Sequence, residues 1–361
     1  MKEPKAFSIG LQNKLTTLKN RREKTKLGRI DFDSKLILAP MAGICNAPYR
    51  LLMEDLGAGF TVSELISCHG INYKNSKTLE MLKLHPLEKN VGIQLFGEDP
   101  HAMAEAALIA ESFGPKLIDI NMGCPVKKVV GKGAGSALLR DSKSLGPYIS
   151  TIKKGLKVPL TIKIRMGWDA DEINADEIIK VAQDNGVEFV AIHGRTRAQQ
   201  YTGKADWSYL EKMAQISALP VIGNGDLHTP YLVKERYQNT NCDALMIARG
   251  ALRNPFIFLE SFTETNDGIK FDGPDYFEVI KRLYEYTIET FPDERGALVQ
   301  IRKLVVWFAA GFPYTAKFRG QMFATNTLEE AMTLAEDYFL NLGLSGKQID
   351  LTETFMTSGH G

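Results

Sequence analysis

One cysteine stands where an apolar run breaks, inside the stretch "LIDINMGCPVKKVVGKGAGSALL" at residues 117–139. Cys124 follows Gly123 and precedes Pro125, and the loop after it is rich in lysine and glycine. A lone cysteine is commonly a small buried apolar residue. A thiol with a pKa of about 8.5 is also mostly protonated at neutral pH, so it can act as a general acid. Cys124 is therefore a candidate for either role.

Other reactive side chains lie in or directly after short apolar runs. They are two amides, a lysine, an arginine and a histidine, namely Gln94, Asn121, Lys163, Arg165 and His193. Taken singly, such a lysine usually extends its ammonium to water. If the runs are parallel strands of one barrel, however, their carboxyl ends meet at one face, and these groups share a site with Cys124.

Two glycine-containing tetrapeptides indicate a phosphate-bearing ligand. "GNGD" spans residues 223–226 and "ARGA" spans residues 248–251, each directly after an apolar run. Glycines allow backbone N–H groups to approach a phosphate, and Arg249 can make a two-pronged charged contact. Each tetrapeptide alone is also compatible with a tight turn. Together they occupy the loops after the last two of eight strands, where barrels commonly bind phosphate.

The elements that must position these groups alternate between short apolar runs and amphipathic helical segments. The eight runs cover residues 35–39, 59–63, 91–96, 116–121, 159–164, 188–193, 219–224 and 243–248. Alternating strand and helix predicts a parallel sheet, and eight units in about 220 residues favour an α/β fold of the (β/α)8 TIM-barrel type. A doubly wound open sheet competes, but no G-x-G-x-x-G follows the first run.

After Phe258 the strand pattern stops and helical periodicity replaces it. Residues 275–342 are expected to form several helices, so the fold class becomes a TIM barrel with a C-terminal helical bundle domain. We expect a basic N-terminal arm at residues 1–34, the barrel at 35–260, the helical domain at 270–345 and a tail at 346–361.

The charge distribution is uneven although the net charge is only +1. Residues 1–35 carry ten Lys/Arg against four Asp/Glu, whereas residues 260–361 carry nine against sixteen. The basic segment could attract phosphates, and it could equally be a solvated arm. The acidic segment would not coat a polyanion, so contacts there must come from local clusters.

Four scattered cysteines and an ordinary composition bound the class of protein. Cys45, Cys68, Cys124 and Cys242 form no C-x-x-C pair and no zinc or iron–sulfur spacing, so we expect no metal site. The chain shows neither a spanning apolar run nor a signal-peptide core. We expect a reduced cytoplasmic protein that does not enter membranes, needs no obligate protein partner and is a monomer.

Six ordered motifs resemble those of the tRNA-dihydrouridine synthase family, in particular its bacterial branch with a C-terminal helical domain. They are "APMAGICNAPYR", "INMGCPVKKVVGKGAGSALL", "TIKIRMGWD", "HGRTRAQQYTGKADW", "VIGNGD" and "IARGALRNPFIF". The resemblance covers roughly residues 35–320. It implies an FMN-dependent enzyme that reduces the C5–C6 double bond of uridine in folded RNA, most often tRNA, with NADPH as reductant.

The resemblance also implies which residues bind FMN. Those expected to hold the ring system are Pro40, Met41, Ala42, Gln94, Lys163 and His193. Those expected to hold the phosphate are Asn224, Gly225, Asp226, Ala248 and Arg249. A lysine and an amide beside the ring suit the negative charge of a reduced flavin.

By the same resemblance, Cys124 donates a proton to C5 of a uracil whose C6 receives hydride. Lys127, Lys128 and Lys132 lie in the same loop and would lower the thiol pKa, which opposes that role. A uridine in folded RNA must leave its stack to reach a barrel mouth. The residues expected to contact this substrate are Asn121, Arg165, Arg195 and Arg197. Further contacts to the RNA backbone are expected from Lys204, Arg302, Lys303, Lys317 and Arg319.

Three alternatives remain open from the sequence. The enzyme could reduce a free pyrimidine in an FMN barrel, but such enzymes lack the "MGCPVKKVVGKGAG" run and a helical RNA-binding tail. It could act on ribosomal RNA instead of tRNA. It could also be a catalytically silent RNA-binding protein, although the presence of Cys124, Lys163 and His193 opposes that reading.

Overall fold

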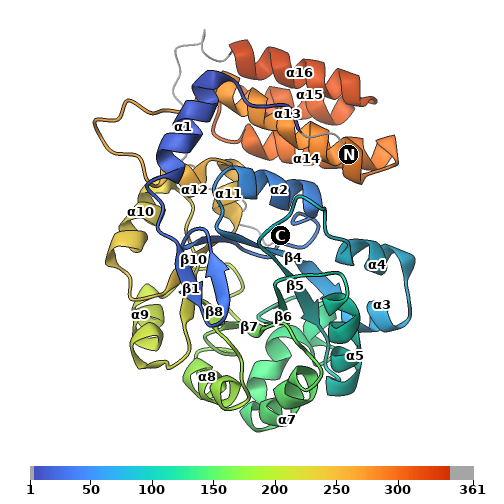
Figure 1. Ribbon diagram of the computed structural model, residues 1–361, viewed down its shortest axis with the longest axis vertical. Helices are drawn as coiled ribbons and strands as arrows, with labels where there is room; N and C mark the ends of the chain where they lie inside the picture. The colour runs from blue at the N-terminus through green and yellow to red at the C-terminus, as the bar shows by residue number, and fades with distance from the viewer. Residues whose placement is uncertain (1–3, 342–361) are drawn as a thin grey trace.

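A computed structural model describes residues 4–341 of the chain. Within this range, eight parallel strands close into a barrel in which β10 pairs with β3, which confirms the predicted (β/α)8 architecture (Figure 1). The strands are β3 (Leu36–Leu38), β4 (Phe60–Ser67), β5 (Val91–Phe96), β6 (Leu117–Met122), β7 (Leu160–Arg165), β8 (Val190–His193), β9 (Val221–Asn224) and β10 (Ala244–Ile247).

Strand β4 is longer than its sequence pattern indicates. The apolar run was expected to end at residue 63, but the strand continues through Ser63 and Glu64 to Ser67. Its pairing with β5 shifts register between Val62 and Leu65, which is the signature of a β-bulge. The bulge interrupts the alternation of side chains, so polar residues lie within the strand.

The segments that connect the strands contain helices, most of which cover the outside of the barrel. They are α2 (Ala47–Asp55), α3 (Cys68–Asn72), α4 (Ser76–Leu82), α5 (Pro100–Glu111), α6 (Lys127–Val130), η1 (Gly135–Arg140), α7 (Ser142–Lys153), α8 (Ala175–Asp184), α9 (Trp207–Ile216), α10 (Pro230–Asn239), α11 (Arg249–Arg253) and α12 (Ile257–Glu260). Helices α6 and α11 instead contribute residues to the open end of the barrel. Several begin with a side-chain cap. Asp99, for example, accepts the Ala102 N–H at 2.7 Å at the start of α5.

Four further helices follow the barrel and form a layer beside its α2 and α11 side (Figure 1). They are α13 (Gly273–Thr290), α14 (Glu294–Phe308), α15 (Thr315–Ala324) and α16 (Leu328–Asn341). Tyr276, Phe312 and Phe339 pack together at their centre, with ring centroids 4.8 to 6.0 Å apart. Residues 342–345 of the expected domain and the expected tail at 346–361 lie outside the described residues.

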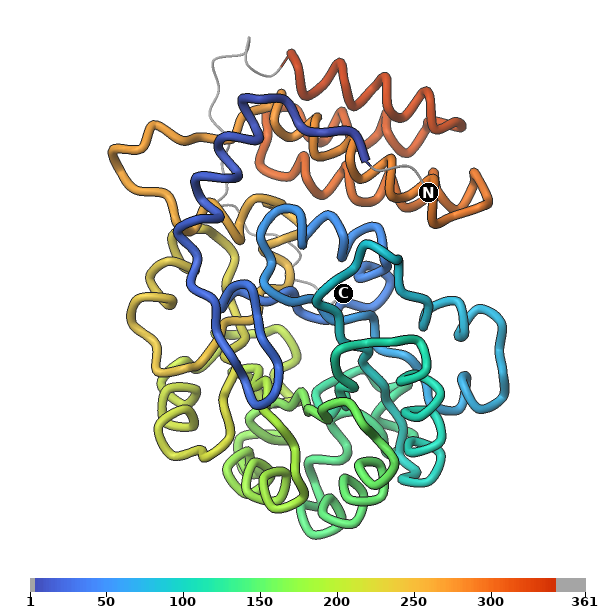
Figure 2. The backbone as a smooth tube through the Cα atoms, viewed as in Figure 1, coloured from blue at the N-terminus to red at the C-terminus, as the bar shows by residue number. Residues whose placement is uncertain are grey.

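The basic N-terminal segment is folded onto both parts of the molecule. Figure 2 shows it running from beside α13 and α16 along α1 (Ile9–Lys19) to the barrel. The Ser8 N–H donates to Glu278 at 2.7 Å, and Lys14 pairs with Asp275 at 2.6 Å. Arg29 pairs with Glu188 at 2.7 Å. Much of its basic charge is therefore balanced by carboxylates of the same chain.

A hairpin at the end of this segment closes one end of the barrel. It consists of β1 (Thr25–Leu27) and β2 (Ile30–Phe32), which pair antiparallel. The Phe32 ring lies 4.7 Å from that of Phe60 and 5.8 Å from that of Phe189, at the starts of β4 and β8. The hairpin therefore plugs the amino-terminal end of the strands and leaves the carboxyl end open. No helix within residues 4–341 is long and apolar enough to span a membrane.

Candidate active site

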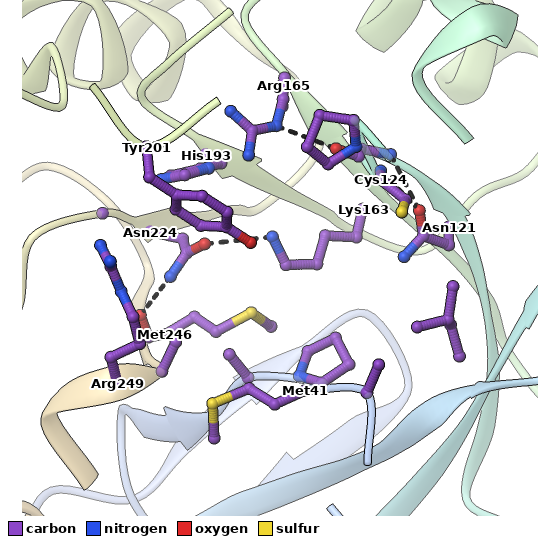
Figure 3. Close-up of a pocket in the computed structure, with 18 of the residues that line it drawn as sticks. Met41, Asn121, Cys124, Lys163, Arg165, His193, Tyr201, Asn224, Met246 and Arg249 are labelled. Carbon is purple, nitrogen blue, oxygen red and sulfur yellow. Dashed lines mark hydrogen bonds between the residues drawn. The ribbon is translucent and has the colours of Figure 1, made fainter. Parts of the chain in front are cut away.

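A pocket of about 290 Å³ lies at the open, carboxyl end of the strands. Figure 3 shows side chains from β3, β6, β7, β8 and β9 and from their loops converging on it. Every residue expected to bind FMN lines this pocket, as do Cys124, Asn121 and Arg165. Arg195 and Arg197 are not among the lining residues. The structure thus brings together the groups that the strand-end pattern placed at one mouth.

Strand alternation explains why these side chains point inward. In β7, the polar residues Thr161, Lys163 and Arg165 alternate with Ile162 and Ile164. Successive side chains of a strand face opposite sides, so one set faces the barrel interior and the other packs under the helices. Ile162 and Ile164 accordingly belong to the large apolar core outside the barrel.

The strand-end amide of Asn121 shapes the loop that carries Cys124. Its Oδ1 atom accepts the backbone N–H groups of Gly123 at 3.1 Å and Cys124 at 2.8 Å. The Cys124 carbonyl in turn accepts Ser136 Oγ–H at 3.0 Å. These bonds hold the thiol-bearing residue against the pocket wall.

The thiol is half-buried, and burial raises the pKa of Cys124, although the Val126 N–H and the Arg165 charge oppose the shift. A raised pKa keeps the thiol protonated at neutral pH. The concern that Lys127, Lys128 and Lys132 would favour thiolate therefore does not hold. Cys124 is in the protonation state that a proton donor needs.

A buried carboxyl, Asp119, holds a side chain of the pocket in place, and the sequence pattern did not reveal it. Asp119 Oδ2 accepts Gln94 Nε2–H at 2.7 Å, and its Oδ1 accepts Thr161 Oγ1–H at 2.6 Å. Gln94 Oε1 accepts Asn121 Nδ2–H at 2.8 Å. Gln94 is thereby fixed in orientation. The signal was an acidic residue inside the apolar run "LIDIN", at the inward position two before Asn121.

Lys163 and His193 differ in charge at neutral pH. Burial lowers the pKa of Lys163 to about 8, so its ammonium is still mostly charged at pH 7. Its Nζ donates to Asn224 Oδ1 at 3.1 Å, in the centre of Figure 3. Burial, with the charges of Arg165 and Lys163, lowers the pKa of His193 well below its usual value. The histidine is therefore neutral.

The two glycine-containing loops lie at one end of the pocket, as expected. Asn224 Nδ2 donates to the Met246 carbonyl at 2.7 Å, which joins β9 to β10. Gly225 has a φ of 136°, and a Cβ there would lie 2.5 Å from Ala205 Cβ, so only glycine fits. Ala248 precedes α11 without a side-chain cap. The Arg249 guanidinium lies 4.8 Å from the Tyr201 ring.

Arg195 is one of the expected substrate contacts that the structure places outside the pocket. Its side chain is 3% exposed and forms two bonds with the Asp226 carboxylate, at 2.8 and 2.9 Å. It also donates to the carbonyls of Thr202 and Gly203. Its guanidinium is therefore occupied within the protein, and its role is to hold the loop after β8 against Asp226. Arg197 lies outside the pocket, 4.3 Å from the Trp168 ring.

A tyrosine that the sequence analysis did not single out completes the lining. Tyr201 lies between two guanidinium groups, 5.6 Å from Arg165 and 4.8 Å from Arg249 (Figure 3). It follows Gln200, whose φ of 51° turns the loop. The only signal was its place in "RAQQYTG" at residues 197–203, in the loop that follows the strand ending at His193.

The donor set of the pocket fits an anionic cofactor such as FMN. Among the described lining residues, Lys163, Arg165 and Arg249 are cations, and Asp226 is the one carboxylate, already paired with Arg195. The surplus of positive charge suits a phosphate at one end and a reduced flavin ring at the other. Among residues 4–341, no group of three or more His, Cys, Asp or Glu could hold a metal ion.

A (β/α)8 barrel whose open end holds a cationic pocket and a half-buried thiol has the architecture of the TIM-barrel enzymes. The dihydrouridine synthase family matches residues 37–342, and the chain belongs to this family, which confirms the resemblance found in its motifs. The chain is 36% identical over 316 residues to tRNA-dihydrouridine synthase B of Xanthomonas campestris pv. campestris, covering 87% of this chain and 95% of that protein. It is 37% identical over 300 residues to tRNA-dihydrouridine synthase B of Pseudomonas aeruginosa, covering 82% and 90%.

Solved structures support the fold. The structure of 2-naphthoyl-CoA reductase superposes with a TM-score of 0.53 at 13% identity, over 67% of this chain and 52% of that one. Histamine dehydrogenase from Rhizobium sp. 4-9 superposes with a TM-score of 0.51 at 12% identity, over 72% of this chain and 50% of that one. The chain thus spans about half the length of these structures, and the likeness concerns the barrel fold.

Proposed function

We propose that this protein reduces the C5–C6 double bond of specific uridines in tRNA, with FMN as cofactor and NADPH as reductant. The observation that carries the proposal is that the Cys124 thiol, whose pKa burial raises, lines the same pocket as Lys163 and the two glycine-containing loops. Membership of the dihydrouridine synthase family supports it. Because tRNA is the proposed substrate, we also propose that the enzyme works in the cytoplasm. We further propose that it is a monomer.

In this proposal Pro40, Met41 and Ala42 form one wall for the flavin ring. Gln94, Lys163 and His193 contact its polar part, and the Lys163 ammonium stabilises negative charge there. The loops with Asn224, Gly225, Asp226, Ala248 and Arg249 hold the phosphate. Because the Asp226 carboxylate is paired with Arg195, this residue would contribute through its backbone. When bound, FMN supplies the hydride that uracil C6 accepts.

The remaining pocket residues would act on the uridine. Cys124 donates its proton to C5 as a general acid, and Asn121 orients the loop of the thiol. Arg165 and Tyr201 line the space where the extruded base would lie. Arg197 and the helices α13–α16 would contact the RNA backbone outside the pocket.

The test is flavin content together with RNA specificity. Purified protein should be yellow and should release FMN, not FAD, on denaturation. Reduced with NADPH, it should form dihydrouridine in unmodified tRNA, and a deletion strain should lack dihydrouridine at defined tRNA positions. Protein that cannot be reconstituted with FMN would refute the cofactor. Loss of dihydrouridine confined to ribosomal RNA would assign the other RNA class, and turnover of free uracil alone would assign a pyrimidine reductase.

A further inference from the structure

Lys303 on α14 does not extend into solvent, although the family resemblance implied that it contacts the RNA backbone. Its Nζ donates a hydrogen bond to the backbone carbonyl of Gly43. Gly43 follows Met41 and Ala42, two residues that line the pocket. A side chain of the helical layer thus reaches the turn that forms one wall of the candidate active site.

The same glycine is held from the barrel side. The Gly43 N–H donates a hydrogen bond to the carboxylate of Glu64, which lies within the bulged part of β4. Gly43 has a φ of 71°, which is a left-handed conformation, and the two bonds are made by its N–H and its carbonyl. A Cβ at this position would meet no atom within 4 Å. The turn is therefore open on its free side, and these two contacts act on it together with the bonds from the Ile44 and Cys45 N–H groups to the Met41 carbonyl, at 3.2 and 3.0 Å.

Lys303 and Glu64 lie on either side of the Gly43 peptide, and the charge of each opposes the effect of burial on the pKa of the other. Burial lowers the pKa of Lys303 and the Glu64 charge opposes that shift. Burial raises the pKa of Glu64, and the Gly43 N–H and the Lys303 charge oppose it. A second bond joins the same elements, because Asn46 Nδ2 donates to Gln300 Oε1 at 3.2 Å, one helical turn before Lys303. The contact is thus a built junction between α14 and the turn at residues 40–46.

We propose that Lys303 is a positioning residue that sets the conformation of the Pro40–Gly43 turn and so couples the seating of the helical layer to the cofactor pocket. The proposal rests on the proposed function, in which this turn is a wall of the FMN site. It replaces the expectation that Lys303 neutralises an RNA phosphate. The two roles differ in one measurable respect, because only positioning affects the protein before RNA is present.

The experiment compares full-length Lys303→Met and Lys303→Arg with Lys281→Met, which removes the same charge from an exposed position on α13. In RNA-free protein, Lys303→Met should weaken FMN binding about tenfold and shift the flavin absorption bands. Lys303→Arg should restore most of both properties because it can still donate to the carbonyl. Lys281→Met should match the parent protein.

Hydrogen exchange on FMN-free protein provides a readout that does not depend on the cofactor. Lys303→Met should speed exchange of the amides of residues 41–46, while exchange in β6 and β7 stays unchanged. Parent-like FMN affinity, absorption bands and exchange in Lys303→Met, whatever its RNA affinity, would overturn the proposal. If parent protein binds no FMN, the proposed function fails, and the exchange comparison still decides whether Lys303 holds the turn. If Lys303→Met does not fold, Lys303→Gln takes its place in the same comparison.

Discussion

Asn121 Oδ1 accepts the backbone N–H of Cys124 at 2.8 Å, so the position of the thiol is set from the end of β6. Asn121 also accepts from Gly123 and donates to Gln94 at 2.8 Å. One amide therefore joins the proposed acid to the proposed cofactor contact. This arrangement predicts that the loop can be disturbed without removing the thiol.

Replacement of Asn121 by alanine should lower the single-turnover rate of dihydrouridine formation about 10- to 100-fold. The reason is misplacement of Cys124, since shifts of about 1 Å can cost that much. FMN content should stay near the parent value. Asn121→Asp is the matched variant, because it keeps an oxygen acceptor for the two N–H groups and should lose less. Equal losses in the two variants would assign the effect to the bond with Gln94.

Arg195→Ala should lower stability and FMN retention and leave the salt dependence of RNA binding unchanged. The Arg195 side chain is 3% exposed and pairs with Asp226, and removal of one partner of a buried ion pair costs about 3 to 5 kcal/mol. Urea unfolding, flavin release and RNA titrations at several salt concentrations provide the measurements.

Arg197→Ala is the contrasting variant, because this arginine lies outside the pocket against Trp168. If it contacts a phosphate, the slope of log affinity against log salt should fall by roughly 0.7 to 0.9, with normal FMN content. A slope change in Arg195→Ala and none in Arg197→Ala would reverse the two assignments.

The N-terminal hairpin should contribute to stability and not to RNA affinity. Phe32 is 1% exposed and contacts Phe60 and Phe189 in the closed end of the barrel. Phe32→Ala should lower the free energy of unfolding by about 3 to 5 kcal/mol, the usual cost for a buried phenylalanine. Lys26→Ala, at an exposed position of β1, is the control and should change stability little. A steep loss of RNA affinity in Lys26→Ala would restore the phosphate-binding reading of this segment.

The barrel could be predicted because β-branched runs and helix caps are local signals. The run 91–96 coincides with β5, and seven other runs overlap the remaining strands. The hairpin could not be predicted in this way, since "TKL" and "IDF" are three residues each and gain stability only by packing on Phe60 and Phe189. The bulge at Glu64 could not be predicted either, because the polar residues there end the apolar pattern by which the strand was recognised.

Within the site, the sequence indicated which residues lie together but not which contacts their side chains already make within the protein. Strand ends predicted that Lys163, His193 and Cys124 share one pocket, as the structure shows. The pairing of Arg195 with Asp226 and the bond from Lys303 to Gly43 join residues that are distant along the chain. Such pairings depend on tertiary geometry, so the family resemblance assigned these cations to RNA without showing that the protein itself occupies them.

FMN affinity should decrease as the pH rises above about 8, because the pKa of Lys163 is about 8 in the cofactor-free protein. Below that pH the ammonium is charged and attracts the anionic ligand, and above it the charge is lost before binding. Lys163→Arg stays charged in this range, so its affinity should not fall there. Fluorescence titration of FMN between pH 6.5 and about 9.5 tests both proteins. A parallel fall in the arginine variant would point to another group.

The last prediction concerns Cys124 as the proton donor. Cys124→Ala should bind FMN and accept electrons from NADPH, because neither step requires a proton at uracil C5. Its rate of uridine reduction should fall about 10²- to 10⁴-fold, the usual contribution of a general acid. Cys124→Ser should recover little, since a hydroxyl is a far weaker acid than a thiol.

Single-turnover mixing of prereduced protein with unmodified tRNA tests this, with flavin reoxidation and dihydrouridine followed together. Because burial raises the pKa of Cys124, loss of the thiol proton should begin above the ordinary value of about 8.5. In Lys163→Arg, where the lysine no longer titrates, the alkaline fall in rate should therefore lie above that value. Near-parent turnover in Cys124→Ala would show that water or another group supplies the proton, and would leave Cys124 as a residue that only lines the pocket.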